Sequence, residues 1–164
     1  MKRVMLTHGY SATVDDADYD AVRRHRWYAL RTHQLVYAAR RVGSRIVLMH
    51  RAVLRAPCRR RVDHVDGDGL NNRRRNLRLC SHAQNIRNSR KQRRRTSSRY
   101  KGVWWAAWAR RWRAAIMVDG RAEHLGYFHK ESAAARAYDA AARARFKQFA
   151  AVNFPRAGER GGLA

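Results

Sequence analysis

Residues 62–88 read VDHVDGDGLNNRRRNLRLCSHAQNIRN, and they decide the fold of the first half of the chain. Asp63 and His64 end a short predicted strand. The aspartates and glycines of residues 66–69 predict a tight loop, and residues 77–80 predict a second strand that returns beside the first. A carboxylate and an imidazole are therefore expected at the end of a short hairpin.

A helix is predicted to follow this hairpin. Ser81 and Gln84 have the spacing of a capping box, which marks a helix start. Asn85 then lies one turn into the helix, near the end that faces back toward the strands. We therefore expect the side chains of Asp63, His64 and Asn85 to point into one common cavity.

This segment resembles the ββα-metal motif of HNH endonucleases, in the homing-endonuclease branch that phages and introns encode. The matching residues are the Asp-His pair, the Gly-Asp-Gly loop, the Asn-Leu-Arg run that begins at Asn76 and the later Asn85. The run of residues 48–51 before the segment also resembles that family. The resemblance implies that Asp63 and Asn85 hold the metal. It also implies that His64 is the general base and that Asn76 braces the loop and orients the histidine.

The implied cofactor is one divalent ion, Mg²⁺ or similar, held by Asp63, Asn85 and phosphate oxygens. His64 would take a proton from the attacking water, a role that suits an imidazole. His82 is an alternative ligand to Asn85, and His50 is interpreted as a structural or phosphate-contacting residue. A calcium loop begun at Asp66 is excluded because leucines would stand where oxygen ligands are required.

The residues before this segment predict a small β/α region. Asp15 or Asp16 is placed to cap a helix over residues 17–27. Two strands are predicted at 35–41 and 45–54, joined by a turn at Gly43-Ser44. The HNH nuclease domain is thus expected to cover residues 1–90, with the ββα-metal motif at about 56–90.

Residues 91–99 are predicted to be a basic linker, since arginine, lysine, serine and threonine dominate there without large apolar side chains. A second domain is expected over residues 100–155. Its β-prone runs at 103–105, 112–118 and 124–128 predict three strands, with a hairpin turn at Asp119-Gly120. The alanine-rich residues 131–149 predict one helix, and residues 156–164 a flexible tail.

Residues 100–155 resemble the DNA-binding domain of plant ethylene-response-factor regulators, a three-stranded antiparallel sheet packed on one helix. The matching segments are Tyr100–Val103, Trp112–Ile116, Leu125–Phe128, Ala134–Asp139 and Asn153–Pro155. In that family the sheet enters the major groove with arginine, lysine and tryptophan side chains. Trp104 stands here where the family has a basic residue, and Lys130 where a threonine cap is commoner.

Strand periodicity selects the candidate DNA-binding residues. Lys101 and Trp105 share one side of the first strand, and Arg111 and Arg113 share one side of the second. Arginines beside tryptophan rings can bond base edges or phosphates. The candidates are Lys101, Trp105, Arg111, Arg113 and Arg121. The alternative interpretation of Trp104, Trp108 and Trp112 is that they belong to the core or its rim.

Composition indicates the partner. The 164 residues include 37 Lys and Arg against 12 Asp and Glu, a formal charge of +25, which favours nucleic acid, here double-stranded DNA. Hydrophobic residues make up 45% of the chain, enough to fold. No apolar run is long enough to cross a membrane, and no secretory leader follows Met1, so we expect a cytoplasmic protein. The two cysteines exclude a disulfide framework and a cysteine-rich zinc site.

The sequence therefore predicts an α+β protein and a metal-dependent HNH DNA endonuclease of homing type, a monomer that nicks one strand. Two alternatives stay open. One is a sequence-specific DNA-binding regulator that keeps an inactive nuclease fold. The weaker one is a packaging protein that binds DNA without a preferred site, through phosphate contacts alone.

Overall fold

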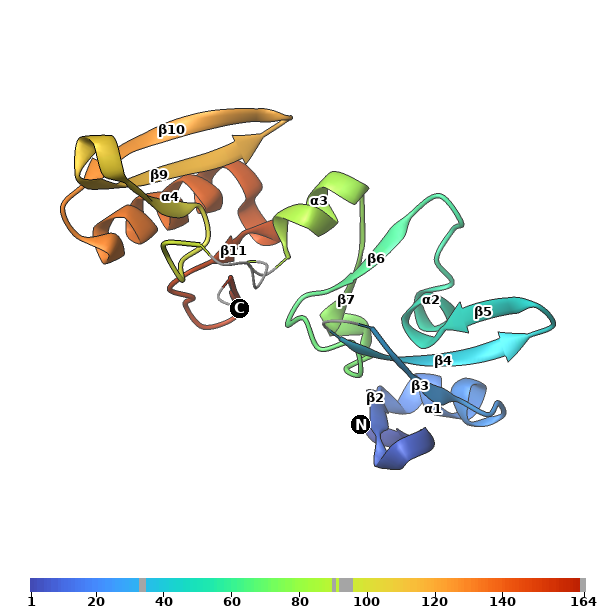
Figure 1. Cartoon of the computed structure of the whole chain (residues 1–164). Helices are drawn as coiled ribbons and strands as arrows, with labels where there is room; N and C mark the ends of the chain where they lie inside the picture. Colours follow the sequence, from blue (N-terminus) through green and yellow to red (C-terminus); the bar gives the residue numbers. More distant parts are fainter. Residues whose placement is uncertain (33–34, 90, 92–95, 163–164) are drawn as a thin grey trace. The chain divides into compact units, whose positions relative to one another are not determined.

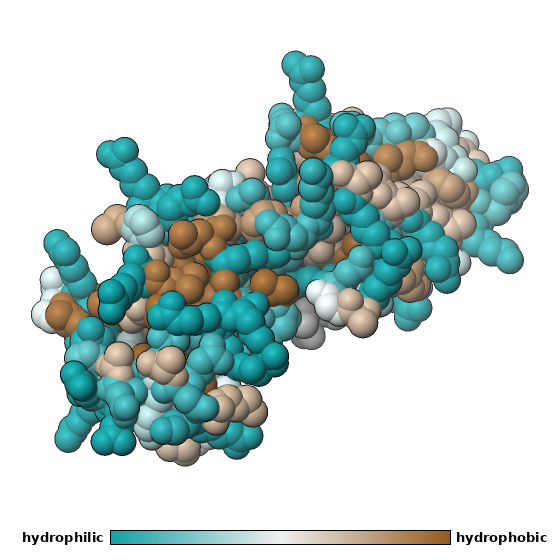
Figure 2. Space-filling view, turned by 180° about the vertical axis from the view of Figure 1, so that it is seen from behind, coloured by the Kyte–Doolittle hydropathy of each residue, from teal (hydrophilic) through white to brown (hydrophobic). Residues whose placement is uncertain are grey.

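The computed structural model describes residues 1–32, 35–89, 91 and 96–162, which form an α+β chain of small sheets and helices (Figure 1). It divides into two compact units, Met1–His82 and Ala83–Ala164. No helix in the described part of the chain has the length and apolarity needed to cross a bilayer. The face drawn in Figure 2 is mostly hydrophilic, as the high content of arginine leads one to expect.

The described residues of the first unit form three antiparallel sheets. Its strands pair as β1 with β2, as β3-β4-β5, and as β6 with β7. Its core includes Val14, Trp27, Met49 and Val53, which are all buried. The elements are β1 (Lys2–Met5), η1 (Thr7–Gly9), β2 (Ser11–Val14), α1 (Asp16–Arg23), β3 (Tyr28–Arg31), β4 (Val36–Val42), β5 (Arg45–Leu48), α2 (Met49–Leu54), β6 (Arg61–His64), η2 (Arg74–Asn76) and β7 (Leu77–Cys80).

Two elements predicted for the first unit end earlier in the structure than the sequence indicates. The second predicted strand ends at Leu48, and residues 49–54 form α2 because Met49 and Val53 bury one face at helical spacing. Helix α1 ends at Arg23 rather than Trp27. The chain leaves the helix there so that the Trp27 indole can enter the core and donate to the Val22 carbonyl at 2.8 Å.

Helix α3 (His82–Arg87) begins one residue after Ser81, and its last five residues belong to the second unit. That unit has a three-stranded antiparallel sheet in the order β10-β9-β8 and a short parallel pair, β11 with β12. Its elements are β8 (Val103–Ala106), η3 (Ala107–Ala109), β9 (Arg111–Val118), β10 (Arg121–Phe128), α4 (Glu131–Phe146), η4 (Lys147–Phe149), β11 (Ala151–Val152) and β12 (Arg160–Gly161).

One face of this sheet and helix α4 bury a common core. Ile116 of β9 clusters with Tyr138 and Ala142 of α4. The hairpin turn lies at Asp119-Gly120, where both residues have positive φ, at 48° and 82°. Such a turn matches the twist of the paired strands. Side chains that alternate with Ile116 along β9 therefore point away from α4.

Of the predicted flexible tail, residues 163–164 lie outside the described residues, and residues 156–162 are bonded to the rest of the second unit. Arg160–Gly161 pairs with β11, and the Arg143 guanidinium donates to both carboxylate oxygens of Glu159 at 2.8 Å. Within the predicted linker, residues 92–95 lie outside the described residues. Lys91 donates from its backbone to Gly162 at 2.8 Å and from its ammonium to Tyr100 at 2.8 Å, so this residue packs within the second unit.

Candidate functional site

The β6–β7 hairpin places Asp63 and His64 in the interior of the first unit. Asp63 is 8% exposed and His64 is 5% exposed. Asp63 stands opposite Arg78 in the antiparallel register, and Arg78 donates from Nε and Nη2 to Asp63 Oδ2 at 2.9 and 2.8 Å. The buried carboxylate of Asp63 thus has a guanidinium as a hydrogen-bonding partner.

The His64 ring lies in a small aromatic cluster. His50 of α2 meets it edge-to-face with ring centroids 4.9 Å apart, and Tyr37 of β4 lies 5.9 Å from it. Nε2 of His64 and Nδ1 of His50 are buried, and neither has a hydrogen-bond partner among the described residues. Buried polar atoms are rarely left unpaired, so these two nitrogens are exceptions in the interior of the unit.

Burial keeps both imidazoles neutral. It lowers the pKa of His64, and the Asn72 side chain and the carboxylates of Asp66, Asp63 and Asp68 only partly oppose this effect. The pKa of His50 falls to about 3, first through burial and then through its neighbours His64 and Arg51. A neutral His64 has a lone pair that can accept a proton from water.

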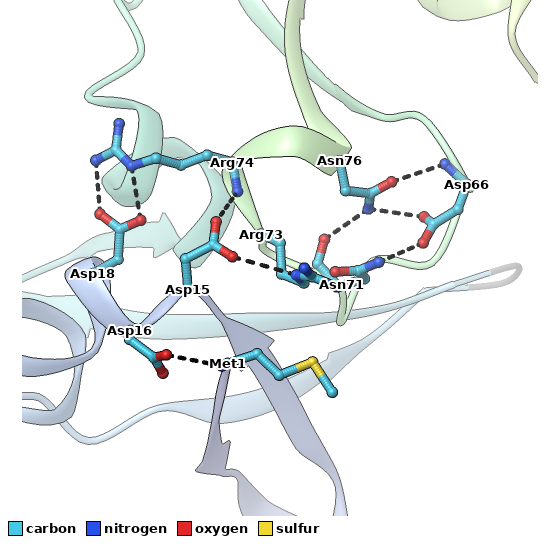
Figure 3. A network of polar contacts seen from close by, with 9 residues as sticks. All are labelled: Met1, Asp15, Asp16, Asp18, Asp66, Asn71, Arg73, Arg74 and Asn76. Atoms are coloured by element: carbon cyan, nitrogen blue, oxygen red, sulfur yellow. Dashed lines mark hydrogen bonds and ion pairs between the residues drawn. The ribbon is translucent and has the colours of Figure 1, made fainter. Parts of the chain in front are cut away.

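Asn76 closes the loop that follows His64 (Figure 3). Its Oδ1 accepts from the Asp66 backbone at 3.0 Å, and its Nδ2 donates to Asp66 Oδ1 at 2.9 Å and to the Asn71 carbonyl at 2.8 Å. The Asp66 carboxylate also accepts from Asn71 Nδ2 at 2.6 Å. The loop is therefore rigidly braced by Asn76. That Asn76 also orients His64 stays a prediction.

The base of the same loop is bonded to the start of α1. The Asp15 carboxylate accepts from the Arg74 backbone at 2.8 Å and from Arg73 Nε at 3.3 Å, and Asp18 accepts two bonds from the Arg74 guanidinium (Figure 3). Asp15 stands at the N-cap position of α1, but its side chain makes no capping bond there. Its carboxylate serves the loop instead.

Gly69 fits the loop against β4. A Cβ atom at this position would lie 2.4 Å from the Val36 carbonyl oxygen and 2.7 Å from the Tyr37 ring. Only glycine allows this approach. Tyr37 is thus shared by the loop and by the His64 cluster, a link between distant segments that the sequence does not reveal.

Asn85, the other predicted metal ligand, is half-buried on α3 in the second unit, and its convergence with Asp63 stays a prediction. No three His, Cys, Asp or Glu side chains gather as a metal site within the described ranges. Mg²⁺ is typically held by one or two carboxylates together with water and phosphate oxygens. The oxygen donors of Asp63 and Asn85 have the chemistry that fits such an ion.

In the second unit, Lys101, one of the predicted DNA-binding residues, is bonded to the backbone of the same unit. Its ammonium donates to the backbone carbonyls of Arg87 at 2.9 Å and Ser89 at 2.6 Å. Burial lowers its pKa to about 8. To bind a phosphate, Lys101 would have to give up both bonds, so the contacts it makes here are structural.

The pairing of β8 with β9 decides which tryptophan lies beside Arg113. Trp104, not Trp105, stands opposite Arg113, and the Arg113 guanidinium lies over the Trp104 ring at 5.1 Å. Trp105 instead meets Trp112 at 5.1 Å. Arg111 shares the face of Arg113 by strand alternation, whereas Arg121 is exposed at the start of β10, opposite Val118. The structure thus brings Arg113 together with Trp104.

A scan against protein-family models, a search of curated proteins and a search of solved structures each find no match for this chain.

Proposed function

We propose that this chain is an HNH-type DNA endonuclease that hydrolyses a phosphodiester bond with the help of a divalent ion. The observation that supports this most is His64, a buried, neutral imidazole with an unpartnered Nε2, next to Asp63 at the end of a braced hairpin. In this proposal β6, β7 and α3 correspond to the ββα-metal motif.

In the proposed reaction, His64 accepts the proton of a water molecule through a ring nitrogen. The water oxygen forms a bond to phosphorus while the bond to the 3′ oxygen breaks. A divalent ion held by Asp63 and Asn85 would supply positive charge for that leaving oxygen. His50 and Tyr37 pack against His64 and limit the positions its ring can take.

The second unit is proposed to read duplex DNA, with β8–β10 on α4 corresponding to the ethylene-response-factor-type domain. The charge of +25 supplies the attraction for the phosphate backbone. Arg113, on the face away from α4, is the arginine proposed to reach a base edge or a phosphate.

The test is conversion of supercoiled plasmid to open circles in Mg²⁺. His64→Ala should lower the cleavage rate by about 10²–10⁴-fold, because a general base contributes that much, while DNA binding is kept. His25→Ala, at an exposed histidine of the same unit, is the matched control and should cleave normally. The proposal fails if wild type cleaves in no divalent ion or if His64→Ala cleaves as wild type does.

One observation favours the alternative, a DNA-binding regulator with an inactive nuclease fold. Nε and Nη2 of Arg78 both donate to Oδ2 of Asp63, so this carboxylate already has a cationic partner. A regulator would bind a preferred DNA site equally well with and without metal, and would never cut it.

A further inference from the structure

The sheet of the second unit carries a group of exposed aromatic side chains on the face away from α4. We call Trp104, Trp108, His124 and Tyr127, together with Arg113, the aromatic patch. Trp108 is 78% exposed, Tyr127 38% and Trp104 37%. Among the described residues, all the exposed large aromatic side chains lie on β8, η3 and β10.

Contacts between these side chains make the patch continuous. Trp104, Arg113 and Tyr127 occupy one row across three strands, since Arg113 pairs with both of the others. Tyr127 contacts the Trp108 ring at 5.3 Å and the His124 ring at 4.6 Å. Arg113 Nε lies 3.3 Å from Nδ1 of His124. The side chains of the patch thus contact one another before any partner binds. The highly exposed Trp108 extends the row beyond Tyr127.

The fold does not require this patch. Residues that alternate with Arg113 along β9, such as Ala114 and Ile116, fill the core against α4. The patch side chains point to the other side, where they leave large apolar rings in water. Grouped apolar surface of this kind marks a binding site more often than it serves stability.

We propose that the aromatic patch stacks on the faces of unpaired bases, so that the second unit prefers DNA with a locally opened stretch. In a closed duplex, each base face is covered by its neighbours and only edges are offered to a groove. Flat rings gain most from a free base face, and Arg113 supplies the charge for the adjoining phosphate. The inference rests on the proposed function because it takes DNA as the partner.

The preference for opened DNA is tested with two DNA molecules that have identical ends. One is a closed duplex, and the other is the same duplex with a short central bubble of mismatched bases. Metal is left out so that no cleavage occurs. Binding is measured by fluorescence anisotropy at several salt concentrations. The wild-type chain should bind the bubble at least about tenfold more tightly, as one or two stacked bases would provide. Tryptophan fluorescence should be quenched by the bubble DNA.

The preference should fall to near unity in Trp108→Leu and should persist in Trp108→Phe, which keeps a ring. Met117→Ala is the matched control, an exposed β9 side chain outside the patch, and should keep the wild-type preference. Because Trp108 is so exposed, its variants should unfold at the wild-type temperature, which is measured alongside.

Equal binding of the duplex and the bubble, or a preference that survives Trp108→Leu, would overturn this inference alone. Failure to bind either DNA would overturn it together with the proposed partner. A clear bubble preference in a protein that cuts no DNA in Mg²⁺ would uphold the patch and contradict only the nuclease proposal.

Discussion

The β6–β7 hairpin and the outer face of β8–β10 use polar and aromatic residues in opposite ways. Around His64, rings and charges are buried, and the Asp63 carboxylate and the Asn76 amide are bonded to named partners. On the aromatic patch, rings and Arg113 face water and contact mainly one another. The first arrangement suits a reaction that needs one neutral base in a fixed place. The second suits recognition, where the partner supplies the missing contacts.

The largest expected effect concerns Arg78. Replacing it with alanine removes the guanidinium that bonds the buried Asp63 carboxylate, and the free energy of unfolding should fall by about 3–5 kcal/mol. Urea unfolding measures this. Arg75→Ala, at an exposed arginine of the same segment, should change it by less than about 0.5 kcal/mol. A small effect of Arg78→Ala would show that the hairpin interior is wetter than its burial indicates.

A smaller effect is expected from pH. The pKa of His50 is near 6.5 in the unfolded chain and about 3 in the folded protein. Below pH 6.5 the folded protein therefore binds fewer protons than the unfolded chain does. Its stabilising contribution is complete above pH 6.5 and is lost progressively toward pH 3. Between pH 6.5 and pH 5 the loss should be about 1.5 kcal/mol.

His50→Gln provides the comparison for this pH dependence. The variant lacks the titrating group, so its unfolding free energy should vary less with pH than that of wild type over the same range. Parallel curves for the two proteins would mean that His50 is solvated in the folded state, in contradiction to its 6% exposure.

The smallest effect is expected on the aromatic patch. Trp108→Ala should change the free energy of unfolding by less than about 0.5 kcal/mol, because its side chain is 78% exposed and contacts only the Tyr127 ring among described rings. Thermal and urea unfolding both measure this. A large loss would make Trp108 part of the packed structure and would remove the contrast between the two regions.

The sequence predicts local features of this fold well. The β6–β7 pairing, the turn at Asp119-Gly120 and the start of α3 after Ser81 follow from residues that are neighbours in the chain. Turn and strand preferences act over a few residues, so the sequence carries their signal directly.

Long-range features escaped prediction. Nothing near His50 in the sequence shows that α2 brings it, with Tyr37 of β4, onto the His64 ring. The apolar spacing of Met49 and Val53 is the one local signal that could have revealed the helix. Likewise, alternation along one strand places Lys101 and Trp105 together, but the pairing with β9 decides that Trp104 accompanies Arg113.

Helix α3 limits how the two halves of this protein can be recombined. Arg87, its last residue, donates to Asp119 at 2.7 Å and accepts from Lys101, so by its contacts the helix belongs to the second unit. By the chemistry proposed for Asn85, it belongs with the hairpin. A chimera joined at residue 90 would keep Asn85 but deprive Arg87 of both partners, and one joined at residue 82 would lose Asn85. The second unit can therefore be exchanged for another only at a junction that keeps Asn85 and also gives Arg87 new partners in place of Asp119 and Lys101. Both requirements fall on a helix of six residues.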